Sequence, residues 1–159
     1  MEEKKAINIV WIKRDIRSQD HQPLHLAESC DLPYLIVYFF EPAFINYPDT
    51  SLRHLQFQYH SLLQLNKKWK SQGKKVELIY QDALPAFHSI LDQFNIKNIF
   101  SYQESGIQAT YDRDKYRLPL PIVDAARLVH VTGQHHRLPG RQVRAGDAVD
   151  LHADGAAVA

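Results

Sequence analysis

The sequence predicts an α/β fold in which one parallel sheet is covered by helices on both faces. Three observations support this prediction. Short apolar runs rich in Val, Ile, Tyr and Phe recur along the first part of the chain, segments with helical spacing lie between them, and two of the runs are nearly continuous. Continuous apolar strands are typical of a parallel sheet that is buried on both faces. Repeated alternation of strand and helix is typical of a doubly wound sheet.

The strands and the first two helices are predicted from these patterns. A short apolar segment at residues 24–30 predicts a short helix. A longer helix is predicted to begin at Thr50 or Ser51 and to end at Gly73, because apolar residues recur on one helical face between them. The four apolar runs predicted as strands are residues 7–12, 34–40, 76–80 and 96–102.

Two further helices complete the predicted alternation. Apolar residues repeat with 3–4–3 spacing over residues 84–94, and Asp82 precedes them as a residue type that caps helix N-termini. Residues 107–115 predict a fourth helix. We therefore expect a Rossmann-like doubly wound parallel sheet of four or five strands, followed by a short tail that is mostly β or irregular.

Residue usage changes near position 115. Residues 1–115 hold ten lysines, four arginines and all seven phenylalanines, whereas residues 116–159 hold no lysine, five arginines and eight of the fourteen alanines. Charge does not mark this break, because both parts are close to neutral. We predict an α/β domain at residues 1–115 and a compositionally foreign tail at residues 116–159.

Composition excludes several classes of protein. The formal net charge of +1 gives no general reason to expect a nucleic acid or an anionic membrane as a partner. A single cysteine, Cys30, excludes an internal disulfide framework and any multi-cysteine metal site. The longest apolar run, residues 32–40, is too short to cross a bilayer. We expect no membrane contact and a cytoplasmic location.

Polar side chains crowd the turn that follows the first predicted strand. In doubly wound sheets, ligands bind beyond the carboxyl ends of the strands. This turn contains no glycine, which counts against both a dinucleotide fingerprint and a phosphate-binding loop. It contains five charged residues instead, namely Lys13, Arg14, Asp15, Arg17 and Asp20.

The same turn carries a resemblance to a known family. Residues 10–21 read VWIKRDIRSQDH, and the segments that agree with them in order and spacing are residues 38–42 (YFFEP), 51–73, 102–104 (YQE) and 111–114 (YDRD). Over about residues 6–115 the chain resembles the N-terminal α/β antenna domain of the cryptochrome/DNA photolyase family.

The resemblance implies a division of labour. In the family, the N-terminal domain can hold an antenna chromophore, which is a folate, a deazaflavin or a flavin. A separate helical domain binds FAD and, in photolyases, the flipped pyrimidine dimer. The intact protein would be a light-driven repair lyase or a blue-light sensor. By this interpretation the chain lacks the FAD domain, contacts DNA only through that domain, and has no catalytic residues and no activity alone.

Five residues are candidates for chromophore binding. Arg14, Asp15 and Arg17 resemble the ion-pair cluster of the family's first turn, and they either tie that turn down, face the helical domain or contact the chromophore. Glu104 ends the fourth strand, where it either accepts a hydrogen bond from a ring N–H or is a solvated carboxylate. Ser105 stands where relatives carry Asp, which counts against a deazaflavin. In the family, folate antennas often use a histidine after the second strand, and here Asn46, Tyr47 and Pro48 occupy that loop, so the resemblance also counts against a folate.

Metal binding and nucleophilic catalysis are not predicted. His21 and His25 are four residues apart, but Pro23 between them favours a turn over a shared helix face. Cys30 lies in a short apolar segment and is interpreted as a packed thiol. No arrangement of a nucleophile and a base can be argued from spacing alone.

The tail offers an alternative function. Residues 128–131 and 143–151 predict short strands joined by turns that contain glycine. Residues 131–151 resemble the second half of the small RNA-binding domain first seen in ribosomal small-subunit protein four. We expect no specific RNA binding from half a domain. The alternative is an α/β scaffold fused to an RNA-binding tail, and a generic hairpin or out-of-frame translation would also explain the composition.

Overall fold

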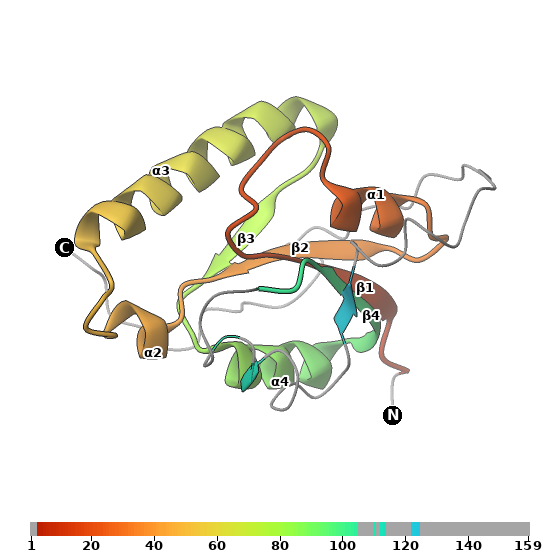
Figure 1. Cartoon of the computed structure of the whole chain (residues 1–159). Coiled ribbons are helices and arrows are strands. Elements are labelled where there is room, and N and C mark those ends of the chain that lie inside the picture. The colour runs from red at the N-terminus through yellow and green to blue at the C-terminus, as the bar shows by residue number, and fades with distance from the viewer. Residues whose placement is uncertain (1–2, 105–109, 111, 114–121, 125–159) are drawn as a thin grey trace.

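The computed structural model of the chain describes residues 3–104, 110, 112–113 and 122–124. Their backbone forms one sheet with helices on both faces, as Figure 1 shows. The sheet has five strands in the order β3-β2-β1-β4-β5, and every pair is parallel. This arrangement confirms the predicted Rossmann-like doubly wound fold.

Short loops join most of the elements. In chain order these are β1 (Ala6–Ile12), α1 (Gln22–Glu28), β2 (Tyr34–Phe39), α2 (Pro42–Ile45), α3 (Leu52–Trp69), the 3-10 turn η1 (Lys70–Gln72), β3 (Val76–Ile79), α4 (Ala83–Gln93), β4 (Asn95–Ser101) and β5 (Ile122–Asp124). β1 and β2 are buried almost throughout, whereas only the first residue of the edge strand β3 is buried. The nearly continuous apolar runs therefore form the centre of the sheet.

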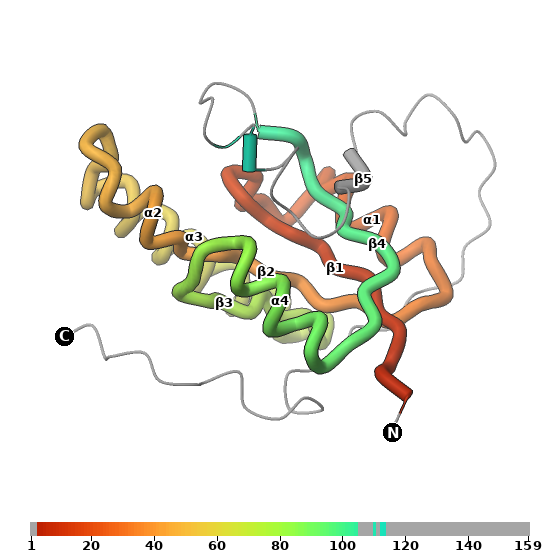
Figure 2. The backbone as a smooth tube through the Cα atoms, turned by 90° about the horizontal axis from the view of Figure 1, so that it is seen from below, coloured from red at the N-terminus to blue at the C-terminus, as the bar shows by residue number. Residues whose placement is uncertain are grey.

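Successive residues of β1 supply two separate cores. Ile9 and Trp11 pack with Phe87 and its neighbours on the face covered by α4. Val10 and Ile12 pack on the opposite face, against residues of α1 and α3. This division follows from the two-residue period of a strand. In Figure 2, α4 lies in front of the sheet and α3 lies behind it.

The ends of the helices follow the sequence signals with one exception. α3 begins after Ser51, and Gly73 ends the 3-10 turn that follows it in the left-handed region at φ 70°, as predicted. α1 begins at Gln22 rather than at residue 24, and Pro23 lies in its first turn. The interpretation of Pro23 as a turn residue is therefore wrong. Proline is tolerated in a first helical turn, where the N–H that it lacks has no helical partner.

A short helix, α2, lies in the segment after β2 that is predicted as a loop. Asp82 stands at the N-cap of α4 as predicted, but its Oδ1 accepts a hydrogen bond from the backbone N–H of Ala43 in α2, 3.0 Å away. The first N–H of α4, that of Ala83, donates to Oε1 of Glu41 at 3.0 Å instead. The carboxylates of Glu41 and Asp82 thus connect the start of α4 to the segment that follows β2.

The fifth strand lies beyond the predicted boundary at residue 115. β5 pairs with β4 in the register Ile99↔Ile122 to Ser101↔Asp124. The boundary itself stays a prediction. Most of the helix predicted at residues 107–115, and the tail strands predicted after residue 127, lie outside the described residues. Among the described helices, none has the length and apolar character needed to span a bilayer.

Candidate functional site

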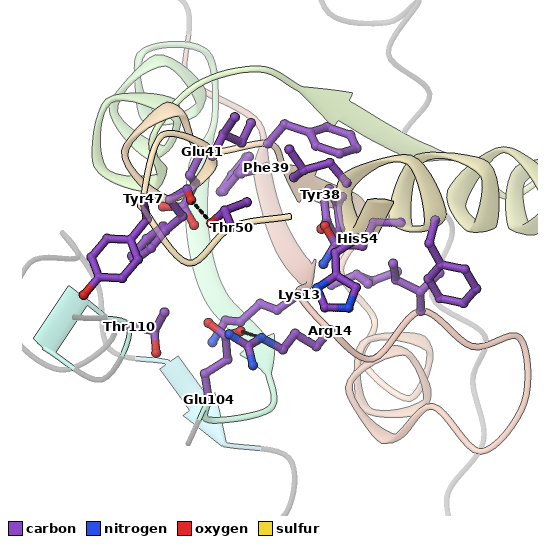
Figure 3. Close-up of a pocket in the computed structure, with 18 of the residues that line it drawn as sticks. Lys13, Arg14, Tyr38, Phe39, Glu41, Tyr47, Thr50, His54, Glu104 and Thr110 are labelled. Carbon is purple, nitrogen blue, oxygen red and sulfur yellow. Dashed lines mark hydrogen bonds and ion pairs between the residues drawn. The ribbon is translucent and has the colours of Figure 1, made fainter. Parts of the chain in front are cut away.

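A cleft of about 770 Å³ opens at the carboxyl ends of β1, β2 and β4. Trp11 and Phe39, from the ends of β1 and β2, contribute to its lining, and His54 contributes from α3. Figure 3 shows Arg14 and Glu104 side by side in the cleft, with Thr110 and Tyr47 toward one end and His54 toward the other. This is the crevice in which α/β sheets bind ligands.

Two guanidinium groups bind the carboxylate of Glu104. Nε of Arg14 lies 3.0 Å from Oε1 of Glu104, and Nη2 of Arg113 donates to Oε2 at 2.8 Å. The side chain of Arg14 is 58% exposed, whereas those of Glu104 and Arg113 are 12% and 9% exposed. Arg14 therefore remains accessible from the cleft while the other two groups form its buried wall.

Arg113 also binds the buried carboxylate of Glu41. Nη1 of Arg113 donates to Oε2 of Glu41, whose other oxygen accepts from Ala83. Burial raises the pKa of Glu41 above its ordinary value, and the nearby negative charges add to this effect, although Arg113 and the Ala83 N–H oppose it. We call Arg14, Glu41, Glu104 and Arg113 the cleft cluster.

Lys13 brings another buried cation to the same place. Its Nζ donates to the carbonyl oxygen of Tyr102 at 2.9 Å and lies 4.3 Å from the ring centroid of Trp11. The guanidinium carbon of Arg113 lies 4.7 Å from the same centroid. Trp11 therefore has two cations within the distance at which an aromatic ring attracts them.

A second polar group lies at the turn after β1. Oδ2 of Asp15 is 2.6 Å from Nε2 of His21, and Oδ1 accepts from the backbone N–H of Lys13 at 2.9 Å. Nδ1 of His21 accepts from the backbone N–H of Leu24 at 3.2 Å, which caps α1. Burial alone would raise the pKa of Asp15, but the hydrogen bonds from His21 and Lys13 lower it below its ordinary value.

Arg17 and Tyr102 extend this group. Nη2 of Arg17 donates to the Tyr102 hydroxyl at 2.8 Å, and its guanidinium carbon lies 5.2 Å from the ring centroid. The backbone N–H of Gln22 donates to the same hydroxyl at 3.2 Å. We call Asp15, Arg17, His21 and Tyr102 the turn cluster; it fastens the loop after β1 to the end of β4.

The structure separates the candidate residues predicted from sequence. Arg14 and Glu104 meet in the cleft, whereas Asp15 and Arg17 belong to the turn cluster. Ser105 lies outside the described residues. The role of all five in binding a chromophore stays a prediction.

Three residues of the site are not among those predicted from sequence. Lys13 belongs to the charged turn after the first predicted strand, and Glu41 and Arg113 belong to segments that carry the family resemblance, but none of the three is among the predicted site residues. A charged residue directly after a buried strand is the signal that could have found the first two, because such a residue stands at the ligand-binding edge of a parallel sheet. Arg113 had no such signal, since its partners Glu41 and Glu104 are distant in sequence.

Other chemistries find little support among the described residues. In this part of the chain no three His, Cys, Asp or Glu side chains are grouped so that they could hold a metal ion. His25 stands in the last turn of α1, whereas His21 is bound to Asp15. Burial raises the pKa of the Cys30 thiol, which donates to the carbonyl of Leu26, so the thiolate is disfavoured.

A comparison with protein-family models agrees with the fold. A family model described as DNA photolyase matches residues 8–130, which is most of the chain. The match includes the turn after β1, the cleft cluster and β5. A comparison with curated proteins found no match. On the strength of the family match, the chain belongs to the DNA photolyase family, as the N-terminal α/β antenna domain of the photolyases and cryptochromes.

Proposed function

We propose that the cleft binds an antenna chromophore, which is a folate, a deazaflavin or a flavin, and that the domain passes the absorbed energy to FAD. One observation carries this proposal: the cleft stands at the ligand-binding edge of the sheet and combines a charged wall with aromatic side chains. Its volume of about 770 Å³ lies within the usual range of cofactor sites.

The charged wall has the hydrogen-bonding capacity that a heterocyclic ring requires. Oε2 of Glu104 accepts a hydrogen bond from Arg113, Oε1 forms an ion pair with Arg14, and a carboxylate oxygen can accept two hydrogen bonds. Glu104 can therefore accept a bond from a ring N–H of a pterin or flavin without releasing Arg14 or Arg113. Arg14 supplies donors to ring carbonyl groups or to an anionic substituent.

Exposed aromatic side chains provide the apolar part of the site. Phe57 and Tyr47 line the cleft and are 71% and 47% exposed. Covering them with a planar ring removes apolar surface from water, and a stacked pair of rings adds further stabilisation. The two residues thus give a bound chromophore a hydrophobic contact beside the polar wall.

The chromophore supplies the light absorption, and the protein supplies position and surroundings. In this proposal Glu104 and Arg14 fix the orientation of the ring, on which the efficiency of energy transfer depends. The intact protein is then a light-driven repair lyase for pyrimidine dimers or a blue-light sensor. Its contact with DNA belongs to the FAD-binding domain of the family.

A titration tests the proposal. FMN, a 5-deazaflavin and a reduced folate are added separately to the chain, and binding is followed by chromophore fluorescence. We expect at least one of them to bind, and the Glu104→Gln variant to bind it roughly tenfold more weakly, because the acceptor of the ring N–H loses its charge.

The matched control is Glu77→Gln. Glu77 lies on the edge strand β3, away from the cleft, and its carboxylate pairs with Lys75. Its affinity should equal that of the unaltered chain. The proposal is wrong if none of the three chromophores binds, or if Glu104→Gln and the control bind equally well.

A further inference from the structure

One face of α3 changes character along the helix. In the second half, Leu65 and Trp69 on this face pack into the core against the sheet. In the first half the same face lines the cleft, although a helix face turned toward the protein is normally apolar. Here it carries polar residues, none of them Asp, Glu, Lys or Arg, at the same spacing of three or four. We call them the polar row: Ser51, His54, Gln58 and Ser61.

The polar row has no partner within the described protein. All four residues line the cleft, and among the residues that the structure describes none of their side chains forms a hydrogen bond or an ion pair. Ser51 stands at the N-cap of α3, yet its hydroxyl makes no capping bond. The donors and acceptors of the row are therefore available to a molecule that occupies the cleft.

The hydroxyl of Tyr38 is a second, independent sign of a ligand. Tyr38 lines the cleft from β2 and is 6% exposed, and within the described part of the chain its hydroxyl has no hydrogen-bond partner. Burial and the nearby carboxylates of Glu104 and Glu41 raise the pKa of Tyr38, so the hydroxyl keeps its proton and remains a donor. Figure 3 shows Tyr38 toward the same end of the cleft as His54. A ligand oxygen that accepts from this hydroxyl removes the cost of a buried, unpaired polar group.

We propose that the polar row and Tyr38 bind the ribityl chain of the chromophore, a linear polyol, while its ring lies against Glu104. The inference rests on the proposed function and narrows the chromophore to a flavin or a deazaflavin. Each hydroxyl of the chain donates and accepts, as do a serine hydroxyl and a glutamine amide. Consecutive residues of the row lie near one helical turn, ~5.4 Å, apart along α3, so a chain lying along the helix bonds to more than one of them.

An uncharged polyol fits these residues better than the tail of a folate does. A folate tail is an aromatic amide that ends in carboxylates, and the polar row contains no Lys or Arg to pair with them. The carboxylates of Glu104 and Glu41 already act on the Tyr38 hydroxyl and would repel a carboxylate placed beside it. Arg14, which also acts on this hydroxyl, is paired with Glu104.

A comparison of two flavins tests the proposal. Riboflavin and lumiflavin share one ring, but lumiflavin carries a methyl group in place of the ribityl chain, and flavin fluorescence reports the binding of both. We expect riboflavin to bind the unaltered chain roughly tenfold more tightly, because the ribityl chain adds hydrogen bonds. 5-Deazariboflavin has the same chain, and its titration in parallel shows which of the two ring systems the cleft prefers.

Two variants remove one polar group each and keep the apolar part of the side chain. Tyr38→Phe and Gln58→Leu should each weaken riboflavin binding roughly threefold and leave lumiflavin binding unchanged. The double variant should bind the two flavins about equally. One control is Gln64→Leu, at an exposed position of α3 that does not line the cleft. The other is Tyr34→Phe, at the opposite end of β2, where the hydroxyl bonds to Glu28. Both controls should keep the preference of the unaltered chain.

The outcomes separate this inference from the proposed function. Equal affinity of the unaltered chain for riboflavin and lumiflavin overturns the inference but leaves a chromophore in the cleft. So does a reduced folate that binds where neither flavin nor 5-deazariboflavin does. If FMN binds more tightly than lumiflavin but riboflavin does not, these residues bind a phosphate and the inference is wrong. A preference that survives in Tyr38→Phe/Gln58→Leu overturns it as well, because the chain is then bound elsewhere. If none of these molecules binds, the proposed function is wrong too.

Discussion

The cleft cluster and the turn cluster contrast two uses of polar side chains at one edge of a sheet. Both draw on the loop after β1 and on the end of β4. In the turn cluster, Asp15 and His21 bond to backbone N–H groups of their own loop and its following helix. In the cleft cluster, Glu41 and Glu104 bind an arginine from beyond β4, and Arg14 remains largely exposed.

Residues that are neighbours in the sequence can therefore have unrelated roles. Arg14 and Asp15 are adjacent, yet one pairs with Glu104 in the cleft and the other with His21 in the turn. The bonds of Asp15 and His21 stay within the loop and the start of α1, whereas the bonds of Glu41 and Glu104 join distant elements around the cleft. The role of each charged residue in such a turn therefore depends on the group that it contacts, not on the motif to which it belongs.

The largest expected effect comes from Glu41, which links the cleft cluster to α4. Replacing Glu41 with Ala takes from the buried Arg113 guanidinium one of its two carboxylates, Glu104 being the other, and removes the acceptor of the Ala83 N–H. Breaking a buried ion pair by removing one partner costs about 3–5 kcal/mol. Because Glu104 still pairs with Arg113, we expect a loss of about 3 kcal/mol, the lower end of this range, in the free energy of unfolding measured with urea.

The matched control for Glu41 is Glu77→Ala, which removes an ion pair with the exposed ammonium of Lys75. Such surface pairs contribute about 0–1 kcal/mol. If both variants lose similar free energy of unfolding, the buried bonds of Glu41 stabilise the fold no more than an exposed ion pair does. The cleft cluster would then not hold distant elements together.

The turn cluster should show a smaller effect with a distinctive pH dependence. Asp15→Asn removes the charge that His21 and the Lys13 N–H stabilise, and we expect a loss of about 1–3 kcal/mol at neutral pH. Because the pKa of Asp15 is lower in the folded chain, its contribution is present above the ordinary value of 3.8 and is lost as pH falls through the folded value.

Urea unfolding of both proteins between about pH 5 and about pH 2 tests this sign. The difference in stability between the unaltered chain and Asp15→Asn should shrink toward the acid end. A difference that stays constant or grows over this interval would show that the lowered pKa of Asp15 does not stabilise the fold.

Arg17 should have the smallest effect. Its guanidinium lies over Tyr102 at 5.2 Å and bonds to the hydroxyl in an exposed position. An exposed cation–π contact contributes about 0.5–1 kcal/mol, so Arg17→Met should lower the free energy of unfolding by no more than that. The coupling energy with Tyr102→Phe, obtained from a double-mutant cycle, checks the hydrogen bond separately. A loss of unfolding free energy well above about 1 kcal/mol would contradict this prediction and show that Arg17 stabilises the turn more than an exposed cation–π contact does.

Much of the fold could be predicted because its strands are buried on both faces. Burial forces continuous apolar runs such as those of β1 and β2, and these are visible without any knowledge of partners. α2 was missed because four residues are too few to show a helical period. β5, with three residues, is too short to show a pattern of its own.

The candidate site was less predictable because its contacts join distant parts of the chain. Arg14 and Glu104 could be nominated from their places at strand ends. The bonds of Glu41 to Ala83 and to Arg113 span long stretches of sequence, and no local pattern indicates them. The position of Lys13 over Trp11 depends on rotamers that only the packed structure defines.

The order of the sheet has a consequence for how a newly made chain folds. β1 is the first strand to be synthesised but stands at the centre, where Ala6 must pair with Asn95 of β4. At ~5–20 residues per second, β4 is made roughly 4–18 s after β1. Until then one edge of an apolar strand has no partner, and such an edge is a template for pairing with other chains. During those seconds the exposed edge of β1 can bind a chaperone or pair with a strand of another copy of the chain.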